Sequence, residues 1–111
     1  MYEVKRFPHQ DRVLFSIENG DKLDYEVIEE AIRSSIQPDC IKNHEITSWT
    51  EGFTFNKDGL DVLFYELYCE DPTQITFELF PMGAHKEQDI EKLYAWVILL
   101  AEHIAKLEKQ A

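Results

Sequence analysis

Residues 86–110 read KEQDIEKLYAWVILLAEHIAKLEKQ, and this stretch decides the fold of the chain. At the angular step of an α-helix, its apolar side chains cover roughly 200° of arc, about twice the width that one sheet face requires. We therefore predict a long C-terminal helix that packs on its own sheet and also against either a first helix or a second subunit. The apolar positions are Ile90, Leu93, Tyr94, Trp96, Val97, Ile98, Leu100, Ala101, Ile104 and Leu107.

The beginning of the chain predicts a strand. Val13, Phe15 and Ile17 alternate with polar residues, a pattern typical of a strand with one buried face. Residues 1–7 form a lead-in that can pair with this strand or fold over the sheet.

An amphipathic helix is predicted next. Its apolar residues recur at steps of three and four between Leu23 and Ile36, while acidic residues share the opposite side. Asp21 or Asp24 can cap its start, and Pro38 stops it after about Gln37.

Three antiparallel strands are predicted at residues 45–56, 60–70 and 75–81, after a loop at residues 39–44. The turn at residues 56–59, Asn-Lys-Asp-Gly, suits a type I turn followed by a glycine bulge.

The register of these strands follows from that turn and from the apolar pattern. Asn56 then faces Leu60, and Tyr65 is set opposite Leu79, because a one-residue slip would place Glu78 among apolar side chains. The predicted core face carries Phe53, Phe55, Leu63, Tyr65, Leu67, Ile75, Phe77 and Leu79. The reverse face carries Thr54, Val62, Phe64, Glu66, Tyr68, Thr76, Glu78, Phe80 and Met82, with Glu66 opposite Glu78.

The predicted fold is a single α+β domain over residues 1–111. Its elements run in the order strand, helix, three strands, helix, and they build a four-stranded, mainly antiparallel sheet with both helices packed on one face. If the first strand lies parallel to its neighbour, the crossover through the first helix should be right-handed.

Composition and charge restrict the function. With 111 residues and 44% hydrophobic content, the chain can bury a core without disulfides or metal. The formal net charge of −11 disfavours binding to nucleic acid or to an anionic membrane surface. The apolar run at residues 95–101 is too short to span a bilayer. Two cysteines, Cys40 and Cys69, are too few for a secreted disulfide scaffold, which indicates a reducing cytoplasm.

The candidate chemistry is sparse. Cys40 and His44 lie four residues apart in the predicted loop, so a thiol and an imidazole can approach each other for nucleophilic attack or metal ligation. Glu66 and Glu78 form the one carboxylate pair that the predicted fold brings together, but an open sheet face offers no pocket to separate their pKa values. The spacing of the other histidines and Cys69 predicts no metal site, and the chain has no motif for a cofactor.

The sequence thus favours a non-catalytic protein that binds another protein or itself, and we expect a homodimer. The apolar reverse face and the broad last helix are the candidate surfaces. The first alternative is an inhibitor or immunity-type protein whose acidic surface blocks a basic partner, and the second is an enzyme that uses Cys40 or the carboxylate pair. The residues predicted to bind a partner are Val62, Phe64, Glu66, Glu78, Phe80, Met82, Trp96 and Leu99.

Overall fold

Six strands and two helices make up the part of the chain that the computed structural model describes, namely residues 2–7, 11–18, 25–45, 51–67, 74–83 and 86–110. In chain order they are β1 (Tyr2–Phe7), β2 (Arg12–Glu18), α1 (Tyr25–Ser35), β3 (Cys40–Glu45), β4 (Glu51–Lys57), β5 (Leu60–Leu67), β6 (Gln74–Met82) and α2 (Glu87–Gln110).

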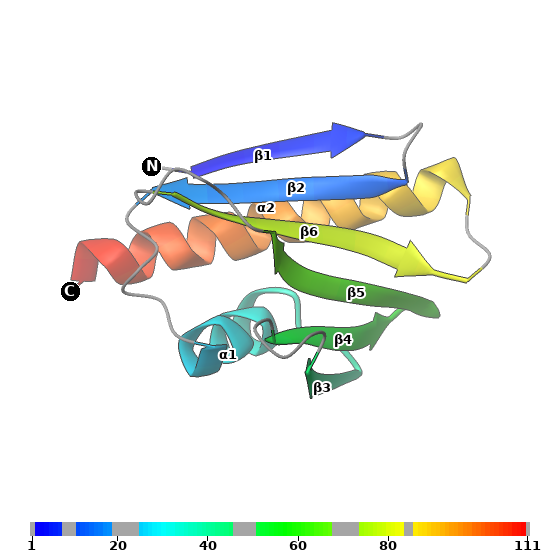
Figure 1. Ribbon diagram of the computed structural model, residues 1–111, viewed down its shortest axis with the longest axis horizontal. Helices are drawn as coiled ribbons and strands as arrows, with labels where there is room; N and C mark the ends of the chain where they lie inside the picture. The colour runs from blue at the N-terminus through cyan, green and yellow to red at the C-terminus, as the bar shows by residue number, and fades with distance from the viewer. Residues whose placement is uncertain are drawn as a thin grey trace.

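The strands form a single antiparallel sheet in the order β1-β2-β6-β5-β4-β3 (Figure 1). The α+β class is as predicted, but the four-stranded sheet is wrong. The prediction left residues 1–7 as a lead-in that can pair or fold over the sheet, whereas they form β1 and pair with β2, and it assigned the second edge strand, β3, to a loop. An edge strand has one neighbour and needs few apolar residues, so its pattern is weak. Ile41, which is buried in the core, is the one aliphatic residue among residues 39–44, so this segment resembled a loop.

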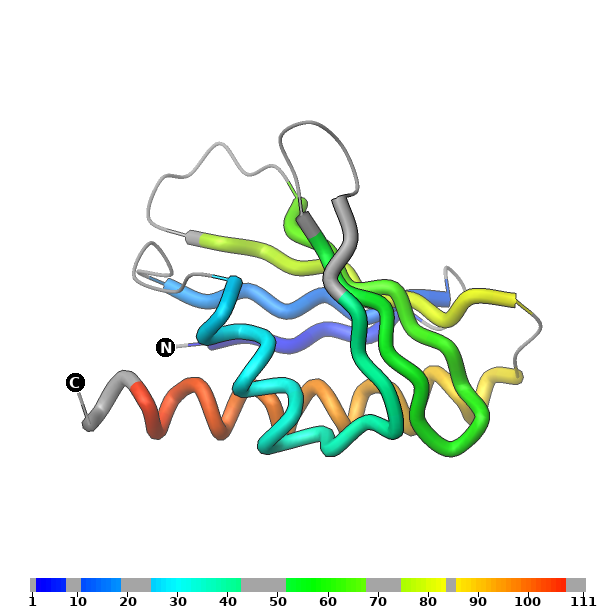
Figure 2. Tube along the Cα trace, turned by 90° about the horizontal axis from the view of Figure 1, so that it is seen from below, coloured from blue at the N-terminus to red at the C-terminus, as the bar shows by residue number. Residues whose placement is uncertain are grey.

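Both helices lie on the same side of the sheet (Figure 2). The helix α2 packs on β1, β2 and β6 and also against α1, which accounts for the wide apolar arc of residues 86–110. The first strand of the prediction, now β2, runs antiparallel to its neighbour β6, so the parallel crossover does not arise.

An aromatic row in the core runs across the sheet from β1 to α1. Its rings follow one another with centroid separations of 4.8 to 6.4 Å, and the closest pair is Phe64 with Phe77. Such offset or edge contacts add to the stability that burial gives. The row consists of Tyr2, Phe15, Phe77, Phe64, Phe53 and Tyr25.

The end of α1 is fixed by a left-handed residue and by a lysine from the sheet. Gln37 has a φ of 57°, and its amide donates to the carbonyl of Ile32 at 3.2 Å. Lys57 of β4 donates from Nζ to the carbonyl of Ile36 at 2.6 Å and lies 5.9 Å from the ring of Trp96. The β4–β5 hairpin is thereby tied to both helices. The predicted caps Asp21 and Asp24 lie outside the described residues.

The turn between β4 and β5 corrects the predicted register. Lys57 pairs directly with Leu60, so the turn contains only Asp58 and Gly59, whose φ values of 52° and 79° are typical of a type I′ turn. The predicted three-residue turn with a bulge is wrong by one residue. Because side chains alternate along a strand, this one-residue shift places every side chain of β5 on the opposite face.

The shift of β5 alone explains the errors in the predicted faces. Relative to β6, Phe64 pairs with Leu79 and Tyr65 pairs with Glu78, in place of the predicted pairing of Tyr65 with Leu79. The assignments of β4 and β6 to the two faces were correct where the structure describes them, whereas those of β5 were reversed. Val62, Phe64 and Glu66 lie on the helix side; Leu63, Tyr65 and Leu67 lie on the other.

Candidate functional site

The side of the sheet away from α1 and α2, which we call the outer face, has no described helix over it (Figure 2). Most of its apolar side chains are half-buried, and Met82 at 38% is the most exposed large one. Strands exposed on one face usually carry polar residues there, so these apolar side chains are unusual. They are Phe7, Leu14, Leu63, Tyr65, Leu67, Phe80 and Met82.

A buried carboxylate lies in the middle of this face. Glu78 of β6 is only 7% exposed and is the one buried charged residue in the described part of the chain. Arg12 of β2 pairs with its Oε1 at 3.2 Å, and the hydroxyl of Tyr65 of β5 donates to its Oε2 at 2.6 Å. A carboxylate removed from water needs such partners. Glu78, Arg12 and Tyr65 therefore form a structural network, which we call the Glu78 cluster.

Aromatic rings surround the Glu78 cluster. The ring of Phe80 meets Tyr65 edge to face with centroids 6.0 Å apart, and the guanidinium of Arg12 lies 5.7 Å from the ring of Phe7. Burial, together with the hydrogen bond to Glu78 and its negative charge, raises the pKa of Tyr65 to about 12. Tyr65 is therefore a neutral hydrogen-bond donor at neutral pH and not a catalytic base.

The predicted Glu66–Glu78 pair does not exist. Glu66 lies opposite Phe77 on the helix side, while Glu78 lies opposite Tyr65 on the outer face, so the sheet separates the two carboxylates. The hydroxyl of Tyr25, at the start of α1, donates to Glu66 at 3.2 Å. The prediction failed because it assigned β5 to the wrong faces.

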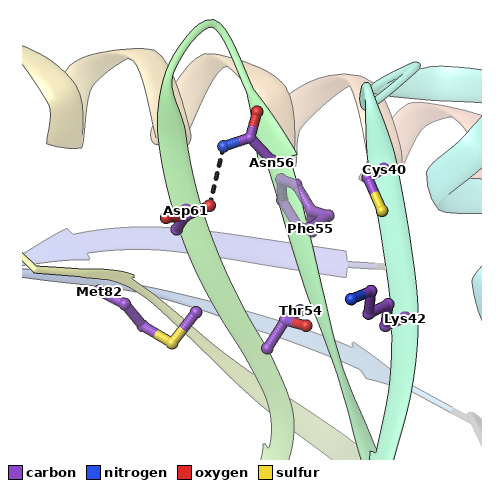
Figure 3. A pocket seen from close by; sticks show the side chains of 7 residues that line it. All are labelled: Cys40, Lys42, Thr54, Phe55, Asn56, Asp61 and Met82. Carbon is purple, nitrogen blue, oxygen red and sulfur yellow. Dashed lines mark hydrogen bonds between the residues drawn. The ribbon is translucent and has the colours of Figure 1, made fainter.

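A shallow depression of about 180 Å³ lies at one end of the outer face. Side chains from β3, β4, β5 and β6 line it (Figure 3). Asn56 donates to the carboxylate of Asp61 at 2.8 Å, and Cys40 is exposed with a free thiol. Cys40 and His44 lie on a strand instead of the predicted loop, and four residues of strand separate their backbones by about 13 Å. Cys69 lies outside the described residues.

The residues predicted to bind a partner divide between the core and the surface. Val62 and Phe64 are at most 1% exposed, and Trp96 is 8% exposed because the β4–β5 hairpin lies beside it. These core side chains are not available to a partner of the folded chain. Glu78, Phe80 and Met82 lie on the outer face. Glu66 lies on the helix side of the sheet, and Leu99, which is 48% exposed, lies on α2.

The Glu78 cluster also contains two residues that the sequence did not single out, Arg12 and Tyr65. The alternation of β2 places Arg12 on the outer face, but its partner lies 66 positions further along the chain. A local pattern carries no signal for such a pair. Tyr65 was instead assigned to the core by the wrong register.

None of the described helices is both long and apolar enough to cross a membrane. Within the described residues, no three His, Cys, Asp or Glu side chains gather in a way that suits a metal ion. No known protein family matches the chain, and comparisons with curated proteins and with solved structures give no match either.

Proposed function

We propose that the protein acts by non-catalytic contact with another protein, and that the outer face of the sheet is the contact surface. The observation that carries this proposal is the Glu78 cluster within a half-buried apolar surface. Covering apolar side chains with a partner takes them out of water, which is favourable. The carboxylate of Glu78 already has an ion pair and a hydrogen bond within the chain, so covering it costs less than covering an unpaired charge.

The polar groups of the outer face are largely paired within the chain. Besides the Glu78 cluster, the hydroxyls of Ser16 and Thr76 lie 2.9 Å apart, and Asn56 bonds Asp61. A partner that covers these groups leaves few of them without a hydrogen bond. This pairing supports a contact surface that forms without rearrangement of the sheet.

The depression supports binding rather than catalysis. Its carboxylate, Asp61, accepts from Asn56, and its thiol, Cys40, lies on an edge strand and is exposed to water. Neither group lies in a closed site of the kind in which acid–base or nucleophilic catalysis usually takes place. We also propose a cytoplasmic location, which the free thiol of Cys40 supports because reducing compartments keep thiols unpaired.

Site-specific photo-crosslinking in the producing cell tests the proposal. A photoreactive amino acid at Leu63 reports on the outer face, and the same amino acid at Leu99 on α2 is the matched control. We expect a covalent adduct with a defined protein, a second copy included, from Leu63 and none from Leu99. Adducts from Leu99 alone, or from neither position, would overturn the proposal.

A further inference from the structure

We infer that the partner of the outer face is a second copy of this chain, related to the first by a two-fold axis that lies across the strands. This inference rests on the proposed function of the outer face. The axis follows one row of the sheet register, which runs through Val4, Phe15, Phe77 and Glu66 on four neighbouring strands.

The charges on β1 and β2 match each other across this axis. In a two-fold contact, residues at equal distances on either side of the axis face each other, and each contact occurs twice. Lys5 and Glu3, which pair with each other at 3.0 Å within one chain, each lie one residue from Val4. Lys5 of one copy therefore faces Glu3 of the second copy, and the two pairs form a group of four alternating charges. Arg12 and Glu18 are likewise each three residues from Phe15 and face each other. All four contacts join opposite charges.

On β5, the contact brings apolar groups together. Tyr65 and Leu67 lie one residue on either side of Glu66, so each faces the other across the axis. Between them, the symmetric contact covers the Glu78 cluster, whose charge Arg12 already balances within each copy. By the same rule, Leu14 faces Ser16 on β2 and Glu78 faces Thr76 on β6, so the contact has an apolar row on β5, mixed rows on β2 and β6, and a charged rim on β1 and β2.

Sheet packing allows this arrangement. Two sheets pack about 10 Å apart with strand directions within about 30°, which shifts facing residues by about one row. Lys, Arg and Glu side chains reach across such a shift, so the opposite charges still meet.

The charge distribution favours a second copy over a basic partner. Over the described strands, the outer face carries three basic residues and four acidic residues, hence a formal charge of −1, compared with −11 for the chain. Two copies can approach through this face with little repulsion, whereas a basic partner finds little net charge there. The seven residues are Lys5, Arg12, Lys42, Glu3, Glu18, Asp61 and Glu78.

The size of the face also suits a second copy. Six strands about 4.8 Å apart, each about seven residues long, cover roughly 24 by 23 Å, or about 550 Å² in projection. Because side chains project from the sheet, the accessible area of this face is larger than its projected area and comes closer to the roughly 800 Å² that each partner buries in a standard interface. A second sheet of the same size can cover this area, while a single peptide strand covers only a fraction of it.

A charge-swap experiment tests the inference. Glu3 and Lys5 have 60% exposed side chains, so changing them should not disturb the fold. We expect the native chain to be a dimer by light scattering after size exclusion. Glu3→Lys and Lys5→Glu should each weaken the dimer about tenfold or more, because each replaces two attractive contacts with two repulsive ones. The double variant should restore the dimer.

Mixing the two single variants gives the sharpest result. Opposite charges then face each other only between unlike chains, so an isotope-labelled Glu3→Lys chain and an unlabelled Lys5→Glu chain should form mainly the heterodimer in native mass spectrometry. A monomeric native chain at 0.5 mM, a concentration at which even Kd values of about 0.1 mM give mostly dimer, would overturn the inference. A statistical mixture of dimers would also overturn it.

The controls separate this inference from the proposed function. Leu63→Lys and Leu99→Lys make the same exchange on the outer face and on α2, and we expect only the first to dissociate the dimer. If Leu63→Lys fails to fold by circular dichroism, Met82→Lys replaces it, since Met82 is 38% exposed. A dimer that only Leu99→Lys dissociates would overturn both proposals. A monomer whose outer face still crosslinks to a different protein would overturn only the choice of partner.

Discussion

Removing the hydroxyl of Tyr65 should destabilise the fold by about 1–2 kcal/mol at neutral pH. A hydrogen bond to a charged group contributes about 1.5–3 kcal/mol. In Tyr65→Phe, the Glu78 carboxylate loses its 2.6 Å donor but keeps Arg12, and its side chain is 10% exposed, so we take the lower part of that range.

The pKa of Tyr65 gives a second route to the same magnitude. A rise from 10.0 to about 12 corresponds to at most about 2.7 kcal/mol, and solvent screening of a half-buried phenol reduces this value to about 1–2 kcal/mol. Because the folded-state pKa is raised, this stability is fully present below pH 10 and is lost as the pH rises through about 12. The unfavourable interaction of the phenolate with Glu78 then replaces the hydrogen bond.

Urea unfolding at equal protein concentration, followed from pH 7 to pH 12, measures this effect as the difference between the native chain and Tyr65→Phe. The difference should be constant up to about pH 10 and should then fall toward zero. The matched control is Tyr94→Phe, whose ring lies 4.8 Å from the guanidinium of Arg6 and away from the Glu78 cluster. A difference below about 0.3 kcal/mol at neutral pH, or one that does not change above pH 10, would refute the reasoning.

Three further predictions concern the turn, the helix cap and the charged contacts between the two copies. Gly59→Ala should destabilise the fold by about 1–2 kcal/mol because its φ is 79°, while Asp58→Asn should be neutral in the same urea experiment, since Asn also suits a type I′ turn. Lys57→Met should cost about 1–2 kcal/mol, read from the thermal midpoint, because the carbonyl of Ile36, directly after α1, loses its donor. Raising the ionic strength from about 0.01 M to about 0.15 M should weaken the dimer, because salt screens the opposite-charge contacts on β1 and β2; tightening would contradict this sign.

The sequence predicted the elements with strong periodicity and failed where two patterns fit equally well. The strand β5 carries apolar residues on both of its faces, so hydrophobicity alone did not decide whether Val62 and Phe64 or Leu63 and Tyr65 belong to the core. The register depends on the turn at Asp58-Gly59. The structure has a two-residue turn there, whereas the prediction assumed a three-residue turn. One wrong turn type reversed one strand and created the false Glu66–Glu78 pair.

The candidate surface was only partly predictable for a different reason. Phe80 and Met82 were placed on the correct face because β6 alternates clearly. The partner of Glu78 was not predictable, because Arg12 becomes its neighbour only through the pairing of β2 with β6. Long-range pairing of this kind depends on the order of the strands in the sheet, which local patterns do not specify.

The central claim is that a second copy covers the outer face, and the methyl groups of the leucines report on this directly. A soluble paramagnetic agent broadens the NMR signals of methyls that water can reach. In the native chain, we predict that the methyls of Leu14 and Leu63 are protected and that they broaden strongly in the dissociated Glu3→Lys variant, while Leu99 broadens equally in both. Equal broadening of Leu14 and Leu63 in the two proteins, or a change confined to Leu99, would contradict the claim.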